Sequence, residues 1–256
     1  MGKRSSNQIR TVLVIFLEEK HRERVQSQFS ETLETGDAHA LYRAFLEDTI
    51  SACLDYDSSH VVVSYSQGKG KKIVIEAMEE LQNSLRGKSR QRLEQNEVEL
   101  WEQTETALSG NLERTFDKCF RLGFNQVLLI DCVTPTITQQ IFEHARRSLA
   151  KKDIVFGPTL EGSYYLLGMR RMIPAVFRQI DWDVSDHIYS RIVEVARDNG
   201  LDWDELELWY DLRQAGDLEY LVRDINAFRI IGDEVSAKRT ETVLETLIQK
   251  FQGEES

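Results

Sequence analysis

The stretch TVLVIFL, residues 11–17, decides the fold class, because its side chains are apolar from Val12 to Leu17 without interruption. A strand of a parallel sheet is covered on both faces, so it reads as a continuous apolar run. The stretches HVVVSY, residues 60–65, and QVLLI, residues 126–130, have the same character. We therefore predict that all three are buried strands of one sheet.

Helical patterns separate these runs. Apolar residues in the segment 38–54 recur with the 3.6-residue period of an amphipathic helix. The alternation of strand and helix favours a mostly parallel sheet flanked by helices on both faces. We predict further strands at 98–101, 153–156, 164–168 and 206–210, further helices at 72–85, 112–122, 139–150, 185–199, 217–225 and 234–251, a solvated turn at 68–72 and a polar connection at 88–92.

The chain has 256 residues, of which 41% are hydrophobic and 29% charged, so it has enough apolar material for a packed core. We find no repeat and no linker rich in Pro, Gly or Ser. We predict one domain over residues 10–251, with flexible termini at 1–9 and 252–256. The last predicted helix is expected to pack on its own domain, or on a second subunit, so the protein is a monomer or a homodimer.

The formal net charge is −11, which disfavours binding to nucleic acid unless a local basic patch is present. The longest apolar run has six residues, whereas a membrane span needs about 20. The basic start MGKRSSNQIR lacks the apolar region of a signal peptide. Cys53, Cys119 and Cys132 form no paired pattern. We expect a cytoplasmic protein that uses neither nucleic acid nor membrane as a partner.

Ligands of open α/β sheets bind beyond the carboxyl ends of the strands, so the residues after each strand are the candidates for a site. Asp131 directly follows QVLLI. Its carboxylate could bind Mg²⁺, Mn²⁺ or a sugar hydroxyl, or it could cap the turn that leads to Pro135. We expect its neighbour Cys132 to be a small buried side chain rather than a nucleophile.

The segment GPTLEGSYYLLG, residues 157–168, is the second candidate. Gly162 and Ser163 would let the backbone approach a ligand closely, and Glu161 would place a carboxylate beside the same cleft. The alternative is an ordinary hairpin in which Tyr164 and Tyr165 pack.

The segment WDVSDH, residues 182–187, opens a predicted helix. Asp183 is either a cap residue or a general base, and His187 is a titratable neighbour. Asp211 follows the predicted last strand and offers a fourth carboxylate near a strand end. The sequence contains no dinucleotide fingerprint, P-loop, zinc-protease motif or nucleophile elbow.

The segments VLLIDCVTPTIT, DIVFGPTLEGSYYLLGM and 182–218 resemble a bacterial family of GT-A-type glycosyltransferases, described as selenodomain-associated or arsenosugar-biosynthesis transferases. The resemblance spans about residues 10–224, and GPTLEGSYYLLGM is its most specific part. It implies the Rossmann-like nucleotide-diphospho-sugar transferase fold. Such enzymes bind a nucleotide sugar across the carboxyl ends of the strands, usually with Mg²⁺ or Mn²⁺.

The sequence departs from the family where that chemistry takes place. The family loop P-x-P-G-x-x-K-T-R-L becomes LEEKHRER, residues 17–24. In G-(S/T)-D-C-P the metal-side aspartate is replaced by Val133, and in D-V-D-T-x-x-D-L the second aspartate is replaced by Arg213. The block D-G-G-Y becomes Glu161-Gly162-Ser163-Tyr164, a smaller change. We therefore expect no conventional metal site and no confidently assigned cofactor.

Two outcomes follow for Arg213. Its guanidinium replaces the cation and binds phosphate, or it pairs with Asp131 or Asp211 across a collapsed cleft, which we favour.

The resemblance implies transfer of a sugar from a nucleotide-diphospho-sugar donor. Glu161 or Asp183 would then be the base, and Arg213 with Arg22 or Arg24 would neutralise the diphosphate. Two alternatives remain. The chain is a non-catalytic homologue, a pseudoenzyme that acts in binding or scaffolding, or it is a nucleotidyltransferase on the same fold. The predicted substrate contacts are Asp131, Gly162, Ser163, Tyr164, Arg213, Arg22 and Arg24.

Overall fold

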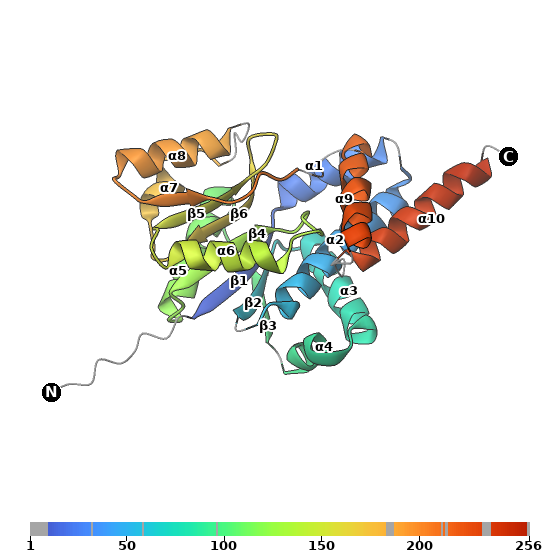
Figure 1. Cartoon of the computed structure of the whole chain (residues 1–256), viewed down its shortest axis with the longest axis horizontal. Coiled ribbons are helices and arrows are strands. Elements are labelled where there is room, and N and C mark those ends of the chain that lie inside the picture. The colour runs from blue at the N-terminus through green and yellow to red at the C-terminus, as the bar shows by residue number, and fades with distance from the viewer. Residues whose placement is uncertain are drawn as a thin grey trace.

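A seven-stranded sheet runs through the middle of the computed structural model (Figure 1). The structure describes residues 10–31, 33–57, 59–95, 97–182, 187–210, 212, 215–231 and 237–254. The strands are β1 (Thr11–Leu17), β2 (Ser59–Tyr65), β3 (Val98–Glu102), β4 (Gln126–Asp131), β5 (Ile154–Pro158), β6 (Tyr164–Met169) and β7 (Trp203–Glu205). Their order across the sheet is β3-β2-β1-β4-β6-β5-β7.

Strand β6 is the one antiparallel member among these seven. It lies between β4 and β5 and pairs antiparallel with both, whereas every other pair of neighbours is parallel. The predicted fold class, a mostly parallel sheet flanked by helices, is confirmed. The parallel strands β1, β2 and β4 therefore end at the same edge of the sheet, and β6 begins there.

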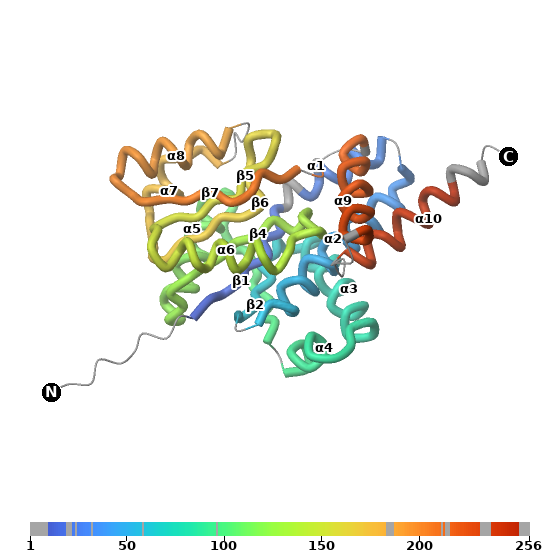
Figure 2. The backbone as a smooth tube through the Cα atoms, in the orientation of Figure 1, coloured from blue at the N-terminus to red at the C-terminus, as the bar shows by residue number. Residues whose placement is uncertain are grey.

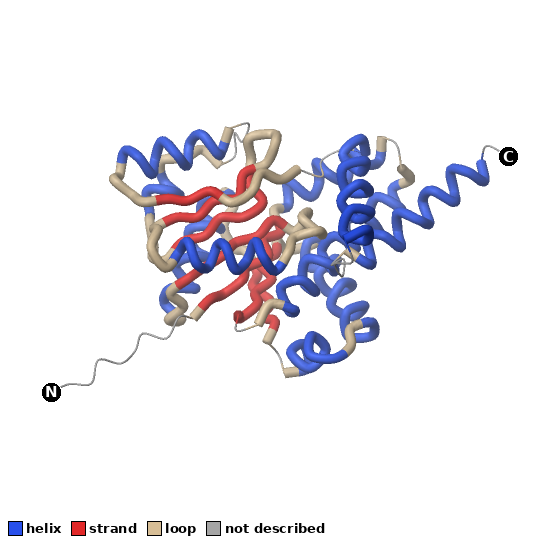
Figure 3. Tube along the Cα trace, in the orientation of Figure 1, coloured by secondary structure: helices blue, strands red, loops and turns tan. Residues whose placement is uncertain are grey.

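Helices cover both faces of the sheet, as Figure 3 shows. They are α1 (Glu19–Ser30), α2 (Thr35–Asp55), α3 (Lys69–Ser84), α4 (Gly87–Glu94), α5 (Leu108–Arg121), α6 (Gln139–Leu149), α7 (Pro174–Arg178), α8 (Ile188–Asp198), α9 (Leu218–Ile231) and α10 (Lys238–Glu254). Along β1, Leu13 and Ile15 join the core under α2, α3 and α6, whereas Val12 and Val14 join the core under α5, α7 and α8. Burial on both faces explains the uninterrupted apolar run.

Four helices and the position of one strand differ from the prediction. Helix α4 occupies the predicted polar connection, and helices α1 and α7 were not predicted at all. Helix α3 begins at Lys69, inside the predicted solvated turn, after Gly68 with φ +73°. Strand β7 is Trp203–Glu205 rather than residues 206–210, because only those three residues pair in register with β5.

Helix α10 packs on its own chain, as predicted. Its residues Leu244 and Leu247 are buried in the same core as helix α2, and Figure 2 shows the red C-terminal helices beside the blue α2. No helix in the described part of the chain combines the length and the apolar character needed to cross a membrane.

Candidate functional site

The end of β4 and the start of β6 lie side by side at the carboxyl edge of the sheet. In the antiparallel register Ile130 is opposite Leu166, so Asp131 and the first residues of β6, Tyr164 and Tyr165, lie beyond this pair at the same edge. The charge of Asp131 acts on the Tyr164 phenol and raises its pKa, so these two side chains lie near each other. Strand β1 ends beside them, because Phe16 pairs with Asp131. The structure thus brings together two of the predicted substrate contacts, Asp131 and Tyr164.

Tyr164 faces two carboxylates in this edge. Burial raises the pKa of its phenol well above the usual value, and the negative charges of Asp131 and Glu18 raise it further. The phenol is therefore protonated at neutral pH and can donate a hydrogen bond. Glu18 entered the sequence analysis only as a replacement in the first loop, because nothing in its local pattern indicates that it reaches Tyr164.

Asp131 caps the turn that follows β4. The Val133 N–H donates a hydrogen bond to its Oδ1 at 3.3 Å. This is the contact expected if Asp131 caps the turn, one of the alternatives that the sequence offers. The same half-buried carboxylate also lies close enough to raise the pKa of Tyr42, Cys132 and Tyr164. Capping the turn and facing Tyr164 are therefore compatible roles.

Helix α1 takes the place of the expected loop after β1. Arg22 is buried in this helix with 3% of its surface exposed. One of its guanidinium nitrogens donates to Gln26 Oε1 at 2.6 Å, and its charge acts on the Tyr42 hydroxyl. Arg22 is thus packed within the protein. The side chain of Arg24 lies outside the described part of the structure.

Tyr42 and Cys132 form a buried polar pair on the other side of Asp131. The Tyr42 hydroxyl lies 3.0 Å from Cys132 Sγ. Burial raises the pKa of both groups well above their usual values. The thiol is therefore neutral and inert, and the prediction that Cys132 is a small buried side chain is confirmed. Tyr42 could not be assigned to the site from sequence, because its position depends on how α2 docks.

The turn between β5 and β6 places Glu161 at its exposed tip. Gly162 has φ +78°, a conformation that favours glycine. The Gly162 N–H donates to the Thr159 carbonyl at 3.0 Å, and the Ser163 N–H donates to Thr159 Oγ1 at 3.1 Å. These two amides, predicted to approach a ligand, are thus engaged within the turn. The Glu161 carboxylate is exposed to solvent.

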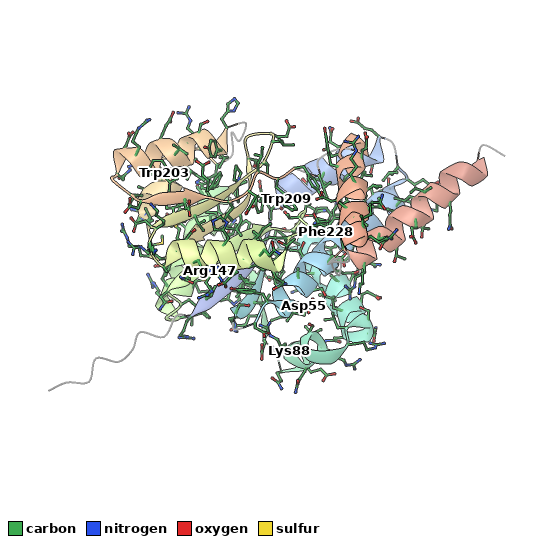
Figure 4. The ribbon with its side chains drawn as sticks, viewed as in Figure 1. Asp55, Lys88, Arg147, Trp203, Trp209 and Phe228 are labelled. Atoms are coloured by element: carbon green, nitrogen blue, oxygen red, sulfur yellow. The ribbon has the colours of Figure 1, made fainter. Side chains whose placement is uncertain are left out.

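The segment after β7 covers the loop that follows Asp131. Trp209 bridges to the β5–β6 turn: its N–H donates to Pro158 at 3.0 Å and its carbonyl accepts from Leu160 at 2.9 Å. The Tyr210 hydroxyl lies 2.9 Å from Thr136 Oγ1. Figure 4 places Trp209 beside α1 and α9. The loop 132–137 is consequently buried.

Residues 49–184 match the protein family described as "Uncharacterized protein conserved in bacteria (DUF2064)", and this match covers more than half of the chain. The chain belongs to this family. No protein with a curated description matches it.

Several solved structures have the same fold as this DUF2064 protein. A protein of Desulfovibrio desulfuricans G20, provisionally described as a nucleotide-diphospho-sugar transferase, is 22% identical, with a TM-score of 0.73 over 95% of this chain and 99% of that one. A cytidylyltransferase of Leptospira borgpetersenii is 10% identical, with a TM-score of 0.52 over 96% of each chain. A 4-diphosphocytidyl-2C-methyl-D-erythritol synthase of Anaerococcus prevotii is 10% identical, with a TM-score of 0.51 over 86% of this chain and 96% of that one. At these identities the likeness concerns the fold.

Among the described residues, the position of the metal-side aspartate does not fit the divalent cation that the resemblance implies. Val133 stands at the metal-side position, offers no oxygen and is buried in the core with 3% exposure. Among the described residues, no three His, Cys, Asp or Glu side chains gather as a metal site. Asp183, Asp211 and Arg213 lie outside the described residues. The proposed pairing of Arg213 with Asp131 therefore stays a prediction.

Proposed function

We propose that this protein binds a nucleotide-diphospho-sugar at the edge formed by Asp131 and Tyr164 and transfers its sugar without a divalent metal ion. The observation that supports this function is the placement of Asp131 beside a protonated Tyr164, where strands of an α/β sheet end and ligands bind. The fold shared with the Desulfovibrio protein and the resemblance to selenodomain-associated and arsenosugar-biosynthesis transferases support the same class of donor.

The transfer would use Glu161 as the base. Its exposed carboxylate would take the proton of an acceptor hydroxyl while the acceptor oxygen attacks the anomeric carbon. The bond from that carbon to the diphosphate breaks, and the nucleoside diphosphate leaves. Asp183 is the second candidate base. Tyr164 would donate a hydrogen bond to the bound donor.

Charge compensation of the diphosphate would come from arginine. Arg22 already binds Gln26 inside the protein, so we assign this role first to Arg24 and Arg213. Glu18 and Asp131 repel an anion at this edge, so we expect weak binding of the free nucleoside diphosphate.

Isothermal titration with UDP, GDP, CDP and ADP, and with UDP- and GDP-sugars, tests the proposal. We expect one nucleotide class to bind equally well with and without Mn²⁺, and Tyr164→Phe to weaken binding by about tenfold through loss of a hydrogen bond. Tyr189→Phe is the matched control, because the Tyr189 hydroxyl binds Glu205 at 2.7 Å instead. Silence across all ligands would contradict the proposal.

A non-catalytic homologue is the second candidate. Its support is that Val133 is packed in the core and that the turn amides of Gly162 and Ser163 are engaged internally. Donor binding without hydrolysis or transfer to any acceptor would favour this alternative. Release of pyrophosphate from CTP or UTP with a sugar phosphate would instead indicate the nucleotidyltransferase, the chemistry named for the Leptospira and Anaerococcus proteins.

A further inference from the structure

A second cavity lies between α2, α3, α4, α6, α9 and α10. Its volume is about 750 Å³, which is within the range of pockets that hold small organic ligands. Its lining includes Thr136 and Ile137 from the loop after β4, but neither Asp131 nor Tyr164. The cavity is therefore separate from the site proposed above, although one loop contributes to both.

Three basic side chains from two separate segments line this cavity. Arg86 precedes α4, and Lys238 and Arg239 begin α10. The chain as a whole carries a net charge of −11, so this concentration of positive charge runs against its composition. The carboxylate in the lining is Asp55, and it accepts a hydrogen bond from the Ser89 hydroxyl.

Among the residues that the structure describes, no carboxylate pairs with Arg86 or Lys238. Arg86 donates hydrogen bonds to the carbonyl oxygens of Asn83 and Leu85, each at 2.7 Å. Both acceptors are neutral, and Arg86 has no ion-pair partner in the described part of the chain. The Lys238 ammonium has no hydrogen-bond or ion-pair partner among the described residues, and the residue is exposed. Two cations thus face the cavity with their charge available to a ligand.

Arg239 forms the inner wall. Its guanidinium donates to Ser84 Oγ at 2.8 Å and to Asp48 Oδ1 at 3.3 Å, while its buried Nε has no hydrogen-bond partner. The contacts hold the guanidinium in place.

The opposite wall adds further donors and an apolar surface. Gln139 and Gln140 begin α6, where the Thr138 cap engages the Ile141 N–H and leaves the N–H groups of these two glutamines without partners inside the helix, so this end favours an anion. Phe228, Leu85 and Ile137 supply apolar surface. Phe228 and Asp55 are seen on the same face of the molecule in Figure 4.

From this arrangement we infer that the cavity binds a phosphate monoester of a small organic molecule. The dianion of a phosphate monoester has three terminal oxygens, which the Arg86 guanidinium, the Lys238 ammonium group and helix N–H groups can approach together. The organic part of the ligand lies against Phe228 and Leu85.

Isothermal titration of the full chain with phenyl phosphate, benzoate and inorganic phosphate tests this inference. We expect phenyl phosphate to bind with a dissociation constant of about 1 mM or below, and more tightly than either other probe. The double variant Arg86→Gln and Lys238→Gln should weaken this binding by about tenfold or more. Both side chains are exposed, so the fold should tolerate their replacement.

The matched control is the double variant Lys72→Gln and Arg90→Gln. It removes the same charge from α3 and α4, but its side chains pair with Glu76 and Glu94 outside the cavity. We expect the control and Asp131→Asn to bind phenyl phosphate as the natural chain does. Absence of binding at about 10 mM, equal weakening by the control, equal binding of benzoate, or loss of binding in Asp131→Asn would each overturn the inference.

Discussion

Gly157 lies against the ring of Tyr165, where β5 ends. A Cβ atom at this position would lie 2.5 Å from that ring, and the ring cannot move freely because its hydroxyl donates to the Glu207 carbonyl at 3.0 Å. We predict that Gly157→Ala lowers the free energy of unfolding by about 2 kcal/mol through overpacking. Urea unfolding measures the loss. Gly36→Ala is the control, because nothing lies within 4 Å of its Cβ position, and a loss no greater than that of the control would contradict the prediction.

Val133 is the residue at which the family pattern and the core conflict. Restoring the family aspartate would place a carboxylate in a position with 3% exposure. We predict that Val133→Asp lowers the free energy of unfolding by about 3 kcal/mol and restores no Mn²⁺ binding, even together with Arg213→Asp. Thermal unfolding and Mn²⁺ titration measure both effects. Val133→Thr controls for the change in shape, and tight Mn²⁺ binding by the double variant would show that this account of the site is wrong.

The docking of α10 on α2 depends on two buried carboxylates. Asp48 accepts hydrogen bonds from the backbone N–H groups of Thr240 at 2.8 Å and Arg239 at 3.2 Å, and so caps the start of α10 from another helix. Glu47 lies 3.1 Å from Arg43 and 3.8 Å from Arg239. This pair of acids binds the C-terminal helix to the rest of the molecule.

These carboxylates make stability depend on pH. Burial raises the pKa of Glu47 to about 7 and that of Asp48 to about 6, although Arg43 and Arg239 oppose the shift of Glu47. A carboxyl group whose pKa is higher in the folded state stabilises the protein at low pH and loses that contribution as pH rises. The free energy of unfolding should therefore fall between about pH 4 and pH 7 from these two groups.

Replacing Glu47 isolates its share of this effect. We compare the free energies of unfolding of Glu47→Gln and the natural chain. From pH 5 to pH 8 we predict that this difference rises by about 2 kcal/mol in favour of the variant, since the amide has no charge to desolvate. Urea unfolding across this pH range measures the difference. Glu79→Gln, on the exposed face of α3, is the control and should show no such trend. A stability difference that is constant with pH would refute the assignment of the shift to Glu47.

The elements that the sequence predicts are those with a continuous apolar run or a clear helical period. Strands β1, β2 and β4 were found because they are buried on both faces. Helix α1 has few buried apolar residues, Val25 and Phe29 among those described. Its formation therefore depends on packing against α2 rather than on an apolar period in its own sequence. The alternating residues 206–210 resemble a strand, but Trp209 forms an isolated bridge to Thr159.

At the scale of the whole molecule, topology predicted part of the site. The rule that ligands bind where parallel strands end selects Asp131 and Tyr164 as candidates, and both lie at one edge of the sheet. The contributions of Glu18 and Tyr42, and the burial of Arg22, could not be predicted, because they depend on how α1 and α2 fold over that edge. The single domain over residues 10–251 stays a prediction.

The absence of fitting ligands predicts how the whole chain responds to metal. A cation bound at 100 times its dissociation constant would stabilise the folded state by about 2.7 kcal/mol, which is several degrees in the unfolding midpoint of a chain of this size. We predict that 1 mM Mn²⁺, Mg²⁺ or EDTA each shifts this midpoint by less than about 1 °C, because Val133 offers no oxygen ligand and no metal-binding cluster of His, Cys, Asp or Glu is found among the described residues. Differential scanning calorimetry measures the shift. A saturable rise with Mn²⁺ that EDTA reverses would mean that carboxylates such as Glu18 and Asp131 bind the ion together, and that transfer without metal is the wrong mechanism.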